Sequence, residues 1–138
     1  MRVLYVEDDE LNYRLVERVL TYDGHEVVRA KDGRTALGLA AKQRPDVVLM
    51  DLLLPDVNGF EIARRMRQVP ALAQVPIIAV TGLWSNGERE RALSEGFAGF
   101  IEKPFTLETL RRELCSVAVG GGADAEGVDG SRSGSSGG

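Results

Sequence analysis

Short apolar runs alternate with segments of helical periodicity along the first 119 residues of the chain. The runs are rich in β-branched and aromatic residues, which is typical of strands buried inside a parallel sheet. The predicted strands are Arg2–Val6, Glu26–Ala30, Val47–Leu54 with its last residues already in a loop, Pro76–Val80 and Gly99–Ile101. Strands that alternate with helices predict a parallel sheet with helices on both faces, because right-handed crossovers leave few alternatives.

The segments between these strands carry the helices. In the first of them, apolar residues recur at helical spacing with charged residues between them; they are Leu11, Leu15, Val19 and Tyr22. Asp9 is the expected N-cap of this helix, and Gly24 can end it. Two further helices are predicted at Thr35–Lys42 and Gly87–Glu95. Asn58 is the expected N-cap of another, which buries Phe60, Ala63 and Met66. Thr106 is the expected N-cap of the last, which buries Leu107, Leu110, Leu114 and Val117.

The last 19 residues differ in composition from the rest of the chain. They hold eight of the sixteen glycines, four serines and only three apolar residues. Such a segment cannot bury enough apolar surface to become ordered. We therefore expect one folded domain over residues 1–119 and a disordered Gly/Ser-rich tail over residues 120–138, which is a native tail, a linker remnant or a cloning remnant.

Composition also narrows the classes of function. The 138-residue chain has a formal net charge of −4, and a mildly acidic chain without clustered Lys and Arg is not expected to bind nucleic acid directly. Its single cysteine excludes a disulfide framework and a zinc cluster. No apolar run reaches the roughly 18 residues of a membrane helix, and the acids from Glu7 onward follow the start too closely for a signal peptide. The expected location is the cytoplasm, without membrane insertion.

Polar side chains follow four of the five predicted strands. In an open parallel sheet, ligands bind beyond the carboxyl ends of the strands, where the strand order reverses. The residues delivered there are Glu7, Asp8 and Asp9 after the first strand, Asp51 after the third, Thr81 and Gly82 after the fourth, and Lys103 and Pro104 after the fifth. The second strand delivers nothing as distinctive. If the first and third strands are neighbours, Glu7, Asp8 and Asp51 converge.

Asp51 is the strongest candidate for chemistry. It lies within an otherwise apolar run, where an uncompensated carboxylate would be costly. Converging carboxylates repel one another, and oxygen ligands without His or Cys favour Mg²⁺ as the cation that relieves this repulsion. An aspartate carboxylate is also a competent nucleophile for forming an acyl phosphate, and Lys103 would offset charge on the transferring oxygens. The alternative is that Asp51 only caps a loop.

Five motifs carry a resemblance to a known family. They are Val6-Glu7-Asp8, Met50-Asp51-Leu52-Leu53-Leu54-Pro55, Asn58-Gly59, Val80-Thr81-Gly82 and Phe100-Ile101-Glu102-Lys103-Pro104-Phe105. In this order and spacing, the chain from residue 2 to about residue 117 resembles the response-regulator receiver domain of two-component signal transduction, of the single-domain, stand-alone type. The resemblance implies a flavodoxin-like, doubly wound α/β fold, with a five-stranded parallel sheet in the order 2-1-3-4-5 and five helices.

The resemblance also implies roles for individual residues. Asp51 would be the phosphoacceptor, Lys103 would contact the phosphoryl group, and Thr81 and Phe100 would form a switch pair. The implied Mg²⁺ ligands are Asp8, Asp51, the backbone carbonyl of Leu53 and, mainly through water, Glu7. The Lys103-Pro104 peptide bond would be cis.

A protein of this kind would be a regulator and not a conventional enzyme, because it catalyses only its own phosphorylation and dephosphorylation. Its expected partners are a histidine kinase or phosphotransfer protein and a downstream protein target. The target would read the surface of the fourth helix, the fifth strand and the fifth helix. The sequence leaves open whether phosphorylation also causes the protein to dimerise.

Some positions differ from the commonest family pattern. Asn58 stands where Asp is frequent and Gly82 where Ala is frequent. Phe100 stands where Tyr is frequent, so the switch would be steric, with no hydroxyl hydrogen bond. Leu53 and Leu83 are apolar where many relatives are polar, and one hypothesis is that they shield an acyl phosphate from water and prolong its lifetime.

Two alternatives to the stand-alone receiver remain. One is that the chain is the receiver part of a longer regulator, such as a transcription factor or a hybrid kinase, although no output domain follows residue 119. The other is a Mg²⁺-dependent phosphohydrolase with Asp51 as its nucleophile. Such enzymes commonly have a second acid where this chain has Leu53.

Four further residues have competing interpretations. Asp9 is expected to cap a helix and not to bind the metal. Trp84 either covers the core or anchors a partner. His25 is expected to be structural, since it lies far from the predicted site, and Cys115 is expected to pack on the last helix.

Overall fold

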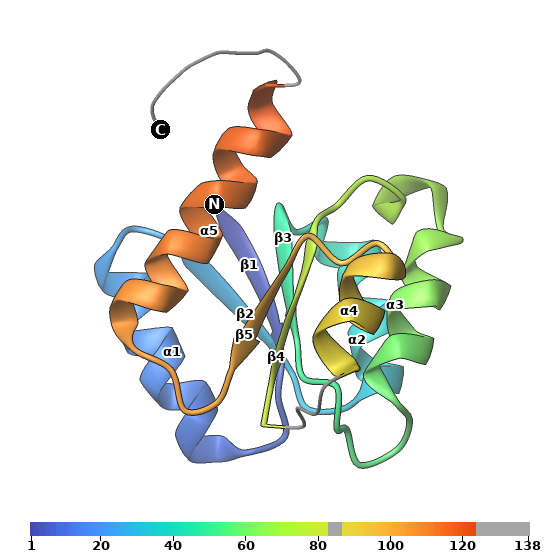
Figure 1. Ribbon diagram of the computed structural model, residues 1–138, viewed down its shortest axis with the longest axis horizontal. Coiled ribbons are helices and arrows are strands. Elements are labelled where there is room, and N and C mark those ends of the chain that lie inside the picture. Colours follow the sequence, from blue (N-terminus) through green and yellow to red (C-terminus); the bar gives the residue numbers. More distant parts are fainter. Residues whose placement is uncertain (83–86, 124–138) are drawn as a thin grey trace.

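The computed structural model describes residues 1–82 and 87–123. Within these ranges the chain forms one sheet with helices on both faces (Figure 1). Leu83, Trp84 and the segment 124–138 lie outside the described residues, so the expectations placed on them stay predictions.

The five strands are parallel and hydrogen-bonded in the order β2-β1-β3-β4-β5, which confirms the predicted doubly wound fold. Their bounds are β1 Arg2–Val6, β2 Glu26–Ala30, β3 Val47–Met50, β4 Ile77–Thr81 and β5 Gly99–Glu102. β3 ends earlier than the predicted run, so Asp51 is the first residue beyond the strand. Because β1 and β3 are neighbours, their carboxyl ends lie side by side at one edge of the sheet.

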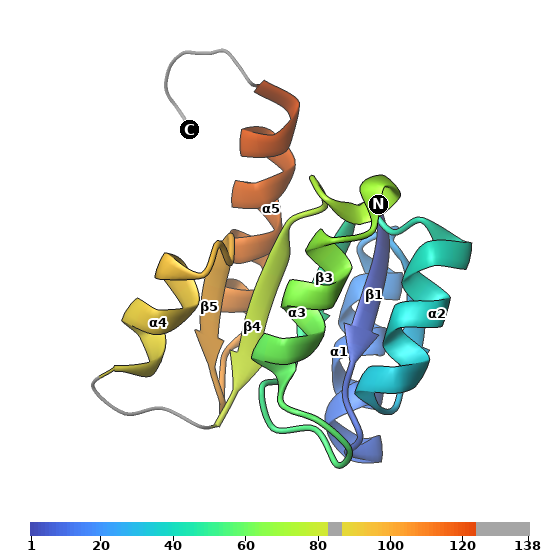
Figure 2. The ribbon, with the colours of Figure 1, turned by 90° about the vertical axis from the view of Figure 1, so that its right-hand side faces the viewer.

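The helices are α1 Glu10–Tyr22, α2 Gly33–Gln43, α3 Gly59–Arg67, α4 Glu88–Ser94 and α5 Leu107–Ala123, with a short 3₁₀ helix, η1, at Pro70–Leu72 that the sequence pattern did not indicate. α1 and α5 cover one face of the sheet, and α2, α3 and α4 cover the other (Figure 1 and Figure 2). Each face has its own apolar core. Tyr5 and Leu49 point to the α1–α5 side, and Leu4 and Val48 to the opposite side, which is the alternation of strands buried on both faces.

The buried face of α1 differs from the one that its leucine spacing indicates. The residues of α1 that pack against the sheet are Tyr13, Val16 and Leu20. Leu11, Leu15 and Tyr22 are instead 66%, 53% and 86% exposed. The helix carries two apolar sets at helical spacing, and only one of them can face the sheet. The other set leaves apolar surface exposed along the helix.

Local signals at the helix ends are found where the sequence predicts them. Asp9, Asn58 and Thr106 each accept a backbone N–H with a side-chain oxygen, at 2.9, 2.7 and 3.1 Å respectively. Gly24 and Gly96 follow α1 and α4 with φ values of 92° and 91°, a conformation that glycine adopts without strain.

The last helix matches its predicted stripe with one exception. Leu110, Leu114 and Val117 are buried, but Leu107 is 49% exposed, because it is the first residue of α5 and has no preceding helical turn to lie over. α5 runs to Ala123 and so enters the segment 120–138 that composition assigns to a tail. Among the described residues, no helix combines the length and the apolar character needed to cross a membrane.

Candidate functional site

Three carboxylates meet at the carboxyl edge of the sheet. Glu7 and Asp8 directly follow β1, and Asp51 directly follows the neighbouring β3. One ligand oxygen from each residue lies within 4.8 Å of the others. Glu7 and Asp51 are only 1% and 5% exposed, whereas Asp8 is exposed. The structure therefore brings the three acids together and holds two of them out of water.

Lys103, on the loop between β5 and α5, supplies the cation of this cluster. Its Nζ donates to Oε1 of Glu7 at 2.6 Å and to Oδ2 of Asp51 at 3.2 Å. Its backbone N–H donates to the carbonyl of Thr81 at 3.0 Å, and the Lys103-Pro104 peptide bond is cis. The lysine is thus tied to the end of β4 through its backbone, while its side chain contacts both buried carboxylates.

Burial and charge shift the pKa values of this pair. Burial raises the pKa of the Glu7 carboxyl, although the Lys103 ammonium opposes the shift. Burial alone would lower the pKa of Lys103, but the hydrogen bond to Glu7 and the charges of Glu7 and Asp51 outweigh it, so this pKa is raised. Lys103 therefore remains protonated at neutral pH and offsets the charge of the two acids.

Tyr5 is a site residue that the sequence analysis missed. Its hydroxyl donates to Oε1 of Glu7 at 2.9 Å, and the backbone N–H of Asp9 donates to Oε2 of Glu7 at 3.2 Å. Burial and the nearby Glu7 charge raise the pKa of Tyr5, so its hydroxyl stays a donor. Residues two apart on a strand share a face, so the spacing of Tyr5 and Glu7 was the available signal.

The loop after β3 folds tightly around Asp51. The N–H of Leu53 donates to Oδ1 of Asp51 at 3.0 Å, which places the Leu53 backbone beside the carboxylate, while its side chain is 56% exposed. The N–H of Gly59 donates to the carbonyl of Leu52 at 3.0 Å. A Cβ at position 59 would lie 2.5 Å from the Asp51 carbonyl oxygen and 2.8 Å from the Leu52 Cα, so this approach requires glycine.

Thr81 and Phe100 lie on the neighbouring strands β4 and β5. Thr81 is fully buried at the last residue of β4, and Phe100 is 6% exposed and pairs in register with Ala79. Ala79 and Phe100 belong to the core on the side of α2, α3 and α4, and Thr81 shares the face of Ala79 because it is two residues away. The guanidinium of Arg89 lies 5.9 Å from the centre of the Phe100 ring, so α4 contacts this ring.

The chain resembles known proteins over most of its length. Residues 3–114 match the response regulator receiver domain. The chain belongs to this family. Response regulator PleD of Caulobacter vibrioides is 39% identical over 103 residues, which span 75% of this chain but only 23% of PleD. Polar-differentiation response regulator DivK of Brucella anthropi is 37% identical over 116 residues, which span 81% of this chain and 94% of DivK.

One similar solved structure contains a magnesium ion. The receiver domain of sensor histidine kinase PA1611 from Pseudomonas aeruginosa, with a magnesium ion coordinated in its active site cleft, is 36% identical with a TM-score of 0.77, over 83% of this chain and 94% of that one. Receiver domains bind Mg²⁺ in an acidic pocket, and this receiver domain has such a cluster. The donors present fit the ion, because they are hard carboxylate oxygens without nitrogen or sulfur.

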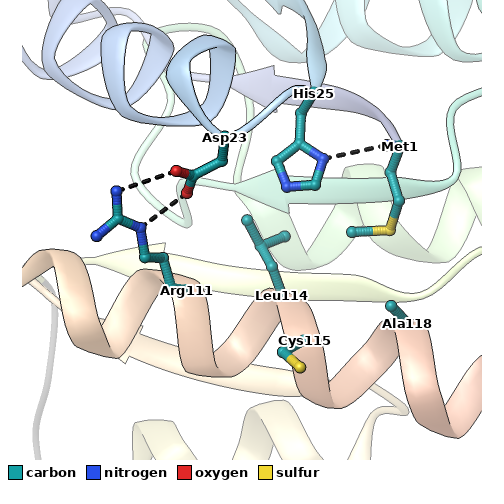
Figure 3. A pocket seen from close by; sticks show the side chains of 7 residues that line it. All are labelled: Met1, Asp23, His25, Arg111, Leu114, Cys115 and Ala118. Atoms are coloured by element: carbon teal, nitrogen blue, oxygen red, sulfur yellow. Dashed lines mark hydrogen bonds and ion pairs between the residues drawn. The ribbon is translucent and has the colours of Figure 1, made fainter.

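A separate cavity of about 550 Å³ lies at the opposite edge of the sheet, where β1 and β2 begin (Figure 3). The Met1 amine lies 3.0 Å from Nδ1 of His25, and Arg111 donates to both carboxylate oxygens of Asp23 at 2.7 and 3.0 Å. His25 thus lies at the end of the sheet away from the acidic cluster, and its structural role stays a prediction. Cys115, which was expected to pack, also lines the cavity but is exposed, because it lies between the buried positions of the α5 stripe.

Proposed function

We propose that this receiver domain accepts a phosphoryl group on Asp51 from a histidine kinase or a phosphotransfer protein and passes the signal on by protein–protein contact. The observation that carries the proposal is the position of Asp51. It is a nearly buried carboxylate at the carboxyl edge of the sheet, 3.2 Å from the Lys103 ammonium and beside two further acids. Its response-regulator relatives support the same role.

In the transfer, a carboxylate oxygen of Asp51 attacks the phosphorus atom of a phosphohistidine. The O–P bond forms as the N–P bond breaks, and the imidazole nitrogen leaves with the bonding electron pair. Lys103 is placed to contact the phosphoryl oxygens, because its Nζ is already at hydrogen-bond distance from Oδ2 of Asp51. The N–H of Leu53 holds Oδ1 and so orients the carboxylate.

Glu7, Asp8 and Asp51 would hold Mg²⁺, with the backbone carbonyl of Leu53 as a further ligand. When bound, the ion offsets the negative charge on the transferring phosphoryl oxygens. Both carboxylate oxygens of Glu7 already accept hydrogen bonds, so we assign Glu7 to contact mainly through water. Asp8 is exposed and open to direct coordination.

The exposed apolar face of α1 is where we expect the donor protein to dock. Leu11 and Leu15 are 66% and 53% exposed on the helix that begins three residues after Glu7. A donor has to bring its phosphohistidine to Asp51, so its contact surface must cover this edge of the sheet. Apolar side chains at the centre of a polar surface are a common basis for such contacts.

We further propose that phosphorylation is read at α4, β5 and α5. The added phosphoryl charge would favour contacts from the Thr81 hydroxyl and Lys103. As Thr81 moves toward the phosphoryl group, Phe100 would turn into the space that Thr81 leaves. Phe100 lies under Arg89 and lines a groove of about 320 Å³ together with residues of β5 and α5. A new rotamer of Phe100 would therefore change the surface that a protein target, or a second copy of the domain, contacts.

Relatives of two architectures match the chain. It spans 94% of DivK and 23% of PleD, so receivers that make up most of a protein and receivers within longer regulators both occur among them. The length of the reading frame in the gene distinguishes a stand-alone receiver from a receiver fragment.

Intact-mass analysis tests the phosphoacceptor proposal. After incubation with acetyl phosphate and Mg²⁺, the wild type is expected to gain one phosphoryl group, and Asp51→Asn is expected to gain none. Asp46→Asn is a matched control, because Asp46 is exposed and accepts the N–H of Arg2 at 2.7 Å near the opposite edge of the sheet. An unmodified wild type, or the same adduct on Asp51→Asn, would contradict the proposal.

A further inference from the structure

Arg29 reaches from β2 to the loop that carries two of the acids. Its Nε donates to the backbone carbonyl of Glu7 at 3.2 Å, and its Nη2 donates to the backbone carbonyl of Asp8 at 3.2 Å. Its Nη1 donates to Oε1 of Glu10 at 2.5 Å. One guanidinium thus ties together the backbone of two acids of the cluster and the first residue of α1.

The guanidinium is itself held in place. It lies 4.8 Å from the centre of the Tyr13 ring, and the Tyr13 ring lies 6.0 Å from the ring of Tyr5. The side chain of Arg29 is only 13% exposed, and the register of the sheet pairs Arg29 with Tyr5. A planar group with fixed position and several donors can hold carbonyl groups in one geometry, which a flexible ammonium cannot do.

We propose that Arg29 is a positioning residue for the metal site: by fixing the backbone of Glu7 and Asp8, it preorganises their carboxylates for Mg²⁺. This inference rests on the proposed function, since it requires that the acidic cluster binds the ion. Groups that orient metal ligands without touching the metal typically change metal affinity by roughly 10- to 100-fold. Arg29 acts on the backbone of two ligand residues at once.

The charge of Arg29 and its hydrogen bonds are expected to change the affinity for Mg²⁺ in opposite directions, so the two contributions can be measured separately. A positive group beside the cluster repels a divalent cation, so loss of the charge alone would strengthen Mg²⁺ binding. Loss of the hydrogen bonds would release two carbonyls and weaken binding. Arg29→Lys keeps the charge but cannot serve all three acceptors from one plane, and Arg29→Gln removes the charge as well.

Arg67 provides the matched control. Its Nη1 and Nη2 donate to the carbonyls of Val75 and Gly96 at 2.8 and 2.9 Å, so it also holds two backbone segments together. Both carbonyls precede the starts of β4 and β5, at the edge of the sheet opposite the acidic cluster. Arg67→Lys and Arg67→Gln therefore report the general cost of removing such a contact.

The test is a calorimetric titration with Mg²⁺, at a temperature where thermal unfolding in EDTA shows every titrated variant to be folded. Arg29→Lys is expected to raise the Kd for Mg²⁺ roughly tenfold. Arg29→Gln is expected to raise it by less, because its lost charge partly compensates for the lost hydrogen bonds, and the Arg67 variants leave the Kd unchanged. If Arg29→Gln does not fold, Arg29→Lys carries the test alone.

Four results would overturn the inference or its premise. An unchanged Kd in the Arg29 variants overturns it, because Arg29 would then contribute only to stability. Tighter binding by Arg29→Gln with no change in Arg29→Lys also overturns it, because charge alone would then be acting. Failure of the wild type to bind Mg²⁺, or undiminished binding by Asp8→Asn, would contradict the proposed metal site itself and not the role of Arg29 alone.

Discussion

Tyr5→Phe removes one hydroxyl from the buried acidic cluster and leaves the ring in place. That hydroxyl donates to Oε1 of Glu7 at 2.9 Å, and Glu7 is 1% exposed, so water cannot readily replace the lost bond. A hydrogen bond to a charged group contributes about 1.5–3 kcal/mol to stability. Because Lys103 still donates to the same oxygen, we expect the lower part of that range, a loss of about 1.5–2 kcal/mol in the free energy of unfolding.

Urea unfolding in EDTA measures this cost without a contribution from bound cations. The midpoint should fall while the m-value stays the same, since the surface exposed on unfolding is nearly unchanged. Tyr13→Phe is the control: its hydroxyl lies 3.4 Å from Oε2 of Glu17 in a partly exposed position, so its removal should change stability by less than about 0.5 kcal/mol.

A double-mutant cycle with Glu7→Gln isolates the contact. If the bond to the carboxylate is the source of the loss, Tyr5→Phe should cost about 1 kcal/mol less in the Glu7→Gln background. A loss under about 0.5 kcal/mol in the wild type, or an equal loss in both backgrounds, would refute the reasoning that burial and charge make this bond strong.

The loops beside the site yield three more tests. Gly59→Ala would place a Cβ 2.5 Å from the Asp51 carbonyl oxygen, so we expect a loss of about 1–3 kcal/mol in thermal unfolding, and wild-type stability would contradict this. The backbone N–H of Gly33, together with other backbone N–H groups, donates to the Asp56 carboxylate and lowers its pKa. The ionised carboxylate therefore stabilises the fold at neutral pH, and this stabilisation is lost as the pH falls below about 4. The urea midpoint of Asp56→Asn should therefore lie below that of the wild type at neutral pH and approach it in acid; a constant gap would contradict this sign. Leu53→Asn should shorten the half-life of the phosphorylated protein severalfold, as measured by intact mass in Mg²⁺, and an unchanged half-life would contradict a shielding role for Leu53.

The parallel sheet and the helix caps could be predicted because they depend on topological or local rules, whereas the strand order followed only from the family resemblance. Each cap is made within three residues, as Asp9 and Asn58 illustrate, so the sequence contains both partners. The buried face of α1 could not be predicted in this way. Leu11 and Leu15 have the same spacing as buried residues of that helix, and which set faces the sheet depends on packing against other elements.

The acidic cluster could be anticipated because parallel strands deliver their following residues to one edge. Arg29 could not, since it lies within β2, a strand whose end carries no distinctive residue. Its contacts with the carbonyls of Glu7 and Asp8 span more than twenty positions and exist because the register places Arg29 opposite Tyr5. Supporting residues of this kind become visible only when strands are aligned in space.

The formal charges of the site explain why a phosphoryl group would act as a signal. Three carboxylates and the Lys103 ammonium leave a charge of −2, and Arg29 does not change this sum because Glu10 pairs with it. A divalent cation would bring the site to neutrality. A phosphoryl group on Asp51 would carry about −1.5 to −2 and replace the −1 of the free carboxylate, so the site would become more negative by about 0.5 to 1. In the proposed switch, donors that move toward the phosphoryl group would offset part of that excess, and Thr81, at the end of β4 beside the strand that carries Phe100, would link such a movement to the α4–β5 surface.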